Sequence, residues 1–175
     1  MKKKLWLLFI SFCFLSCSRE KKVEIIEKTT KDTISEEKGL SYISHNIKLS
    51  MIRVDDKCGE WGGDSDKLIF YRDTIDNKAL FADYTKIRLT CKRLIEDSTL
   101  VTRIKVSKKA ERLIVESVRE LSKIKITRKN YASHSGLYNM IMLSDSSLIV
   151  YDFPSERWRG FEKLILELKL SRFTE

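Results

Sequence analysis

The residues best suited to chemistry lie together in one short segment, residues 55–66. Its sequence is Asp-Asp-Lys-Cys-Gly-Glu-Trp-Gly-Gly-Asp-Ser-Asp, which holds five carboxylates and three glycines. Several carboxylate oxygens on a tightly turning backbone are what Ca²⁺ requires. However, the order of acids and glycine of an EF-hand is missing, and no Gly-Lys-Ser/Thr follows the glycines as in a phosphate loop. We therefore assign no metal and no cofactor, and expect a structural loop, while cation binding by residues 55–66 stays open.

Trp61, inside this segment, has two interpretations. An exposed tryptophan could recognise a sugar or a protein, because such a ring offers a large contact area with one polar atom. Alternatively, the ring covers a sheet edge beside a Cys58–Cys91 bridge, and the glycines allow the turn. We favour the structural interpretation and keep Trp61 as a candidate binding residue.

Catalytic chemistry has little support in the sequence. His45 and His134 are the only histidines, and the chain lacks Cys-x-x-Cys, His-Glu-x-x-His and Gly-x-Ser-x-Gly. A serine triad would have to assemble His134 with a distant Asp and Ser. We therefore predict no enzyme and no catalytic residue, and keep a small extracytoplasmic hydrolase as the alternative function.

The N-terminus has the pattern of an export signal. Lys2, Lys3 and Lys4 precede an apolar run over residues 5–15, which is shorter than the roughly 20 residues of a membrane-spanning helix. Phe14-Leu15-Ser16-Cys17 follows, and it resembles the lipobox of bacterial lipoproteins, in the looser form found in Bacteroidetes. The alternative is an ordinary secretory signal that happens to contain Cys13 and Cys17.

The resemblance implies a lipid-anchored protein of the cell envelope. Cys17 would carry a thioether diacylglycerol, often with a further acyl chain such as palmitate, and would become the first residue of the mature chain. We expect a signal peptide over residues 1–16, a flexible charged tether over 17–40 and a single domain over 41–175. The implied location is the outer membrane, facing the periplasm or the cell surface.

The remaining cysteines predict a disulfide. Of the four cysteines, Cys13 leaves with the signal peptide and Cys17 is committed to lipid. Cys58 and Cys91 remain as an even pair in an oxidising compartment, which favours a bridge between them. The alternative is two buried free thiols.

The folded domain is basic. The chain carries a formal net charge of +9, of which three units belong to the signal peptide. Lys108, Lys109 and Arg112 begin a basic run along a predicted helix and form a candidate binding surface. Outside the cytoplasm we expect an acidic protein, anionic lipid headgroups or acidic glycans as the partner, and no nucleic acid. A solvated helix face would give the same run of residues.

Periodicity predicts the elements that position these residues. Alternating or compact β-prone runs cover 46–54, 67–72, 78–84, 86–92 and 100–106, with a break at 96–98. Ser107 is placed to cap a helix over 108–122, and residues 138–143 and 148–153 predict a hairpin ended by Pro154. Ser155 would cap a last helix with an apolar seam of Trp158, Phe161, Ile165 and Leu168, in which Gly160 permits close packing.

These elements predict an α+β fold, an antiparallel sheet of a meander plus a C-terminal hairpin, with two helices packed on one face. We expect this domain to be a non-enzymatic binding or structural module of the envelope. Envelope assembly, inhibition, or immunity against an acidic effector are roles that act through a protein surface of this kind.

Overall fold

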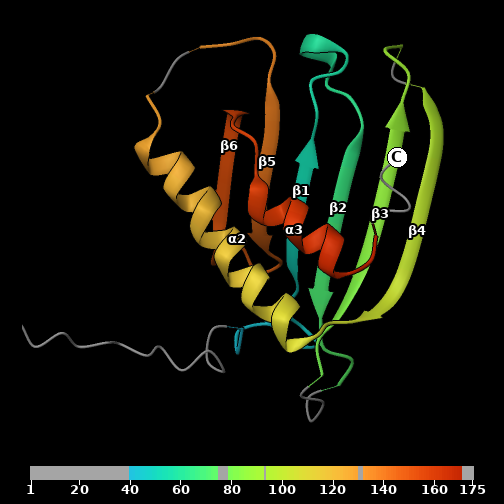
Figure 1. The fold of residues 1–175 in the computed structure, drawn as a ribbon, viewed down its shortest axis with the longest axis vertical. Helices are drawn as coiled ribbons and strands as arrows, with labels where there is room; N and C mark the ends of the chain where they lie inside the picture. Colours follow the sequence, from blue (N-terminus) through green and yellow to red (C-terminus); the bar gives the residue numbers. More distant parts are fainter. Residues whose placement is uncertain (1–39, 75–78, 93, 130–131, 171–175) are drawn as a thin grey trace, which may run out of the picture. The chain divides into compact units, whose positions relative to one another are not determined.

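A computed structural model describes residues 40–74, 79–92, 94–129 and 132–170; the predicted signal peptide, nearly all of the tether and the predicted turn at Asp76-Asn77 lie outside them. Six strands form one antiparallel sheet in the order β4-β3-β2-β1-β5-β6 (Figure 1). The strands are β1 (Leu49–Val54), β2 (Ser65–Tyr71), β3 (Phe81–Leu89), β4 (Ile95–Lys105), β5 (Leu137–Leu143) and β6 (Ile149–Ser155).

The connections make the predicted meander and hairpin. Strands β1 to β4 are neighbours in chain order, and β5 then returns to the free side of β1. There Leu49 lies opposite Leu143 and Val54 opposite Tyr138. The chain is already packed at Leu40, which is buried in the core just before the predicted start of the domain.

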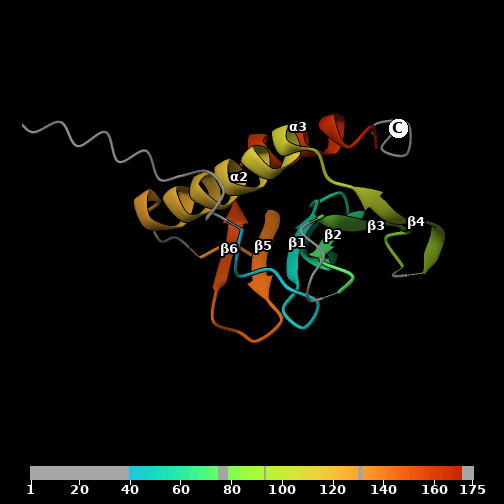
Figure 2. The ribbon, with the colours of Figure 1, turned by 90° about the horizontal axis from the view of Figure 1, so that it is seen from below.

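Both helices, α2 (Lys108–Thr127) and α3 (Arg159–Glu167), cover the same face of the sheet (Figure 2). The predicted cap of α2 is confirmed, because Ser107 Oγ accepts a hydrogen bond from Ala110 N at 3.0 Å. The α+β fold with two helices on one face is therefore confirmed. Helix α2 runs five residues beyond its predicted end, to the point where Arg128 turns toward β6.

The core lies between the sheet and the helices. Alternate strand residues such as Met51, Phe70 and Tyr84 are fully buried and face the helices. The predicted seam of the last helix is confirmed, since all four of its members are buried: Trp158, Phe161, Ile165 and Leu168.

Gly160 has the predicted packing role. A Cβ atom there would lie 2.9 Å from Cα of Ser117 and 2.7 Å from its Oγ. Only a residue without a side chain lets the start of α3 approach α2 this closely, which is why the modest helix penalty of glycine is tolerated here.

Three further boundary predictions were wrong, and edge strands explain two of them. Asp97 and Ser98 are paired in β4, so the predicted break does not exist. Strand β6 continues through Pro154, because the outer side of an edge strand requires no N–H from that residue. Ser155 does not cap α3, which starts after Trp158; its first amides, of Arg159 and Gly160, donate to the Glu120 carboxylate.

Candidate functional site

The predicted disulfide is present. The Cα atoms of Cys58 and Cys91 are 5.1 Å apart and the two sulfur atoms are bonded. Cys58 lies in the β1–β2 loop, beside the short turn Gly59–Trp61, and Cys91 follows β3. The bridge therefore joins two loops at one end of the sheet, and closing this span stabilises the fold by about 3–4 kcal/mol in the chain-entropy account.

Three carboxylates of the acidic loop, those of Asp55, Asp64 and Asp66, make contacts within the fold. Asp55 Oδ1 accepts hydrogen bonds from the backbone N–H groups of Lys57 and Asp64, at 3.1 and 2.9 Å. Asp64 Oδ1 accepts from Leu89 N at 3.0 Å. Within the described ranges, no group of three His, Cys, Asp or Glu residues is arranged to hold a metal ion. The loop thus stabilises its own turn and links β1–β2 to β3.

The exposure of Trp61 does not agree with the favoured interpretation, in which its ring covers a sheet edge. Its side chain stands on the turn Gly59–Trp61 and the residue is 53% exposed. A ring packed over a sheet edge would be mostly buried, so Trp61 remains a candidate contact residue beside the disulfide.

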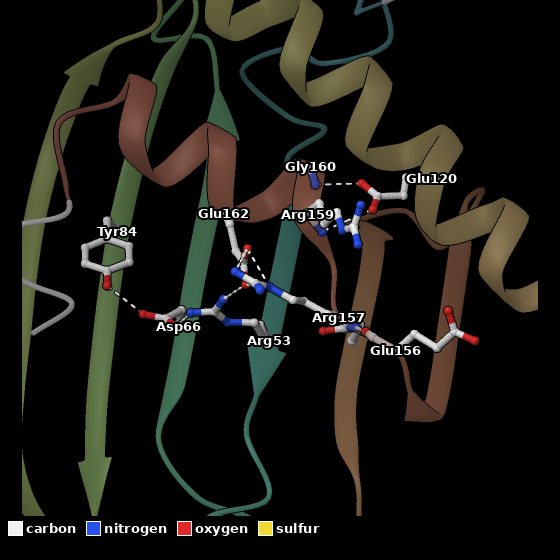
Figure 3. A network of polar contacts seen from close by, with 10 residues as sticks. Arg53, Asp66, Tyr84, Glu120, Glu156, Arg157, Arg159, Gly160 and Glu162 are labelled. Atoms are coloured by element: carbon white, nitrogen blue, oxygen red, sulfur yellow. Dashed lines mark hydrogen bonds and ion pairs between the residues drawn. The ribbon is translucent and has the colours of Figure 1, made fainter.

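A network of charged side chains lies between the sheet and α3 (Figure 3). Arg53 and Asp66 are opposite each other on β1 and β2, and Arg53 Nη2 is 2.6 Å from Asp66 Oδ2. Tyr84 of β3 donates to Asp66 Oδ1 at 2.6 Å. Glu162 of α3 lies 3.6 Å from Arg53 and accepts from Arg157 at 2.9 Å. The network connects α3 to the sheet, and each carboxylate of the network has a partner.

The phenol of Tyr84 should make stability depend on alkaline pH. Burial, followed by the hydrogen bond to Asp66, raises the pKa of Tyr84 far above 10. The folded state therefore keeps a proton that the unfolded chain loses, so this stabilisation is full below pH 10 and declines as the pH rises further.

We expect Tyr84→Phe to lower the free energy of unfolding by about 1–3 kcal/mol at pH 7, because Asp66 loses a buried donor. The difference in free energy of unfolding between wild type and variant should become smaller above pH 10, where the wild type loses the stabilisation that comes from the protonated phenol. Urea unfolding at pH 7 and at pH 10.5 measures both effects. A deficit that grows with pH would show that the phenol is not held protonated by the fold.

The two histidines do not form a joint site. Both are exposed; His45 precedes β1 and His134 precedes β5. Because β1 and β5 are antiparallel with six paired positions, their starting ends are separated by the length of the strand, about 20 Å. A hydrolase that combines His45 with His134 does not fit this arrangement.

The predicted basic surface at the start of α2 is partly offset by acids. Lys108 lies 3.1 Å from Glu111, and Lys109 pairs with Glu167 of α3. The hydrogen bond from Lys109 lowers the pKa of Glu167, while Arg112 is exposed on the next turn. The Lys109–Glu167 pair joins the start of α2 to the end of α3, whereas Lys108 and Glu111 pair within α2. Both pairs make the net charge offered to a partner smaller than the sequence suggests.

The face of the sheet opposite the helices carries many large apolar residues among a few polar ones. No described helix or strand covers it (Figure 2). Alternation places every second strand residue there. We call this surface the open face. Its large apolar members are Ile52, Val54, Ile69, Tyr71, Phe81, Ile87, Leu100, Tyr138, Met140, Met142, Ile149 and Tyr151.

Aromatic rings and cations are paired on the open face. The rings of Tyr138 and Tyr151 are 5.2 Å apart. Lys48 Nζ lies 5.4 Å from the centre of the Tyr71 ring, and the Arg103 guanidinium 4.9 Å from that of Phe81. Such cation–π contacts place positively charged groups directly over aromatic rings of the open face.

Of the surfaces considered, the open face has the properties of a contact surface, whereas the acidic loop and the charged network have structural roles. The sequence did not identify it, although the alternation that creates it is visible in β5 and β6.

No protein-family model, curated protein or solved structure significantly matches the chain.

Proposed function

We propose that this protein is a lipid-anchored, non-enzymatic binding module of the bacterial cell envelope, and that its open face holds an acidic protein partner. The open face is the observation that carries the proposal. One face of an antiparallel sheet is often solvated, but it is then mostly polar. Here Ile149 is 55% exposed, Tyr151 44% and Leu100 66%, so apolar surface is presented to the surroundings.

The composition of the open face is that of a protein interface. Tyrosine, methionine and arginine are enriched in interface cores, and the open face combines Tyr138, Met140 and Tyr151 with Arg103 at its side. The aromatic side chains are ordered by contacts with one another before any partner arrives, which reduces the entropy lost on binding.

The basic residues around the open face support an acidic partner. Lys48, Lys67, Arg103 and Lys105 lie on or beside the open face, and the mature chain has a basic excess. The carboxylate of Asp83 accepts hydrogen bonds from the Tyr71 hydroxyl and from Arg103 N, so its charge is engaged locally. Complementary potentials steer association and select against basic proteins.

The lipobox resemblance at Phe14–Cys17 supports the anchor. No described helix is both long and apolar enough to cross a bilayer. With Cys17 lipidated, the domain would work close to a membrane surface, where the effective concentration of a membrane-bound partner is high.

Cys17→Ala should release the protein from the membrane fraction and remove the mass of the lipid, because the thioether can no longer form. Intact-protein mass spectrometry and membrane fractionation measure the two effects. Cys13→Ala is the matched control and should leave both unchanged. Membrane retention of an unlipidated Cys17→Ala protein would contradict the proposed anchor.

Two acidic substitutions on the open face should abolish partner binding. Ile149→Glu with Tyr151→Glu adds like charge and removes apolar contact, so we expect affinity for the acidic partner to fall at least about a hundredfold. The matched control is Ile126→Glu with Leu166→Glu on the helices, since these residues are 82% and 63% exposed. The control makes the same change of charge and should bind like the wild type.

The partner for this measurement is captured from the envelope fraction by wild-type protein, identified by mass spectrometry, purified and titrated by calorimetry. Lys108→Glu with Arg112→Glu is titrated alongside. If only Lys108→Glu with Arg112→Glu loses binding, the partner binds at the start of α2, the surface that the sequence suggested, and not at the open face. Equal loss in the control on the helices would refute the role of the open face.

A further inference from the structure

Strand β4 ends the sheet with an open hydrogen-bonding edge. It pairs with β3 on one side, and none of the described strands lies on its other side (Figure 1). β4 is 11 residues long, and most of its residues are exposed. An edge of this length offers a row of backbone N–H and C=O groups that can pair with another strand.

The middle of this edge lacks the usual protection. Proteins guard an edge strand with charges, bulges or prolines. In β4 the irregularities occur near the two ends, beside Leu89 and between Ala82 and Tyr84 of β3. Between them, residues 98–101 form the uncharged, β-prone run Ser-Thr-Leu-Val, in which Leu100 is 66% exposed, and Thr102 and Arg103 belong to the second irregularity.

Charges of opposite sign flank this run. Glu96 and Asp97 precede it, whereas Arg103 and Lys105 follow it. All four lie in β4, and Arg103 also contacts Asp73 at 2.7 Å. An antiparallel copy of the same strand would bring the acidic end of one chain to the basic end of the other, at both ends of the pair.

We infer that two copies of this chain associate through β4, as an antiparallel pair with the two-fold axis at Leu100. In this register Thr99 lies opposite Val101 of the second copy. Both of these residues are on the helix side of the sheet, since they neighbour the helix-facing Lys86 and Tyr84 of β3. The two Leu100 side chains meet on the open face, where each covers apolar surface of the other.

The charge pattern selects a second copy over an unrelated strand. A C2 interface is self-complementary, and a strand with an acidic and a basic end satisfies this condition only when it is antiparallel to itself. The dimer would join two open faces in one continuous sheet. This inference concerns the hydrogen-bonding edge of β4, and it shares only Leu100, Arg103 and Lys105 with the proposed contact surface.

The two-fold axis makes a direct test available. In an antiparallel pair, opposite Cα atoms are about 4.5–5.5 Å apart, which suits a disulfide. Leu100→Cys, in the full mature chain with Cys17→Ser, should form a covalent dimer under mild oxidation. Ile149→Cys on β6 is the matched control; it is 55% exposed and should stay monomeric.

Charge reversal tests the register. Glu96→Lys with Asp97→Lys should weaken dimerisation about tenfold in sedimentation equilibrium, more at low salt than at high salt. Adding Arg103→Glu and Lys105→Glu should restore it. Covalent dimer from Leu100→Cys together with this rescue supports the inference. A wild-type protein that stays monomeric at about 100 µM, a concentration at which association weaker than about −5.5 kcal/mol goes undetected, would overturn the inference. Equal crosslinking from Ile149→Cys would also overturn it, whatever partner binds the open face.

Discussion

Trp158→Ala is expected to lower the free energy of unfolding by about 3–5 kcal/mol. Trp158 is 1% exposed, its ring stacks on Phe161 at 5.0 Å, and its Nε1–H donates to Ser117 O at 3.0 Å. Removing the ring leaves a cavity between α2, α3 and the sheet and deprives a buried carbonyl of its donor. Urea unfolding followed by circular dichroism measures the loss.

The control for this prediction is Leu166→Ala in α3, the helix that Trp158 precedes. Leu166 is 63% exposed, so this substitution should change stability by no more than about 0.5 kcal/mol. A small effect at Trp158, comparable with that at Leu166, would contradict the packing of α3 on the core described above.

Asp152→Leu is expected to lower the free energy of unfolding by about 3–5 kcal/mol, because it removes the buried carboxylate that pairs with the guanidinium of Arg128. The Asp152 side chain is fully buried and that of Arg128 is 8% exposed. Arg128 Nη1 lies 3.0 Å from Asp152 Oδ2, and its Nη2 donates to Phe153 O at 3.1 Å. This contact holds the end of α2 on β6, and thermal unfolding reports its loss.

The double variant Arg128→Met with Asp152→Leu separates the buried charge from the shape of the site. Replacing both charges with apolar groups is often neutral, so most of the stability should return. If the double variant is as unstable as Asp152→Leu alone, packing rather than the uncompensated charge accounts for the effect.

Local patterns predicted much of the fold. The 3.6-residue spacing of Trp158, Phe161, Ile165 and Leu168 identified the buried side of the last helix correctly, because a short amphipathic helix can pack only one way. The Cys58–Cys91 bridge was predicted from the number of cysteines and from an expected oxidising compartment alone. Gly160 was recognised as a packing glycine, since nothing else favours glycine inside a helix.

Features set by tertiary contacts were missed. Strand β4 shows weak alternation because both of its faces are largely exposed, so Glu96 and Asp97 resembled a break. The pairing of Lys109 with Glu167 depends on how two helices meet, which no local pattern contains. The open face was missed as a contact surface for the same reason. Two helices on one face were predicted, but the strand register decides which side chains, such as Met140 and Tyr151, lie on the other face.

Photo-crosslinking in the intact envelope tests most directly the claim that the open face is the working surface. A photoreactive phenylalanine analogue replaces Tyr151 on the open face or, as the control, Leu166 on α3, and adducts are identified by mass spectrometry. The account predicts one acidic protein attached at position 151 and none at 166, with the adduct suppressed by excess unlabelled domain. An adduct at position 166 with none at 151 would contradict it.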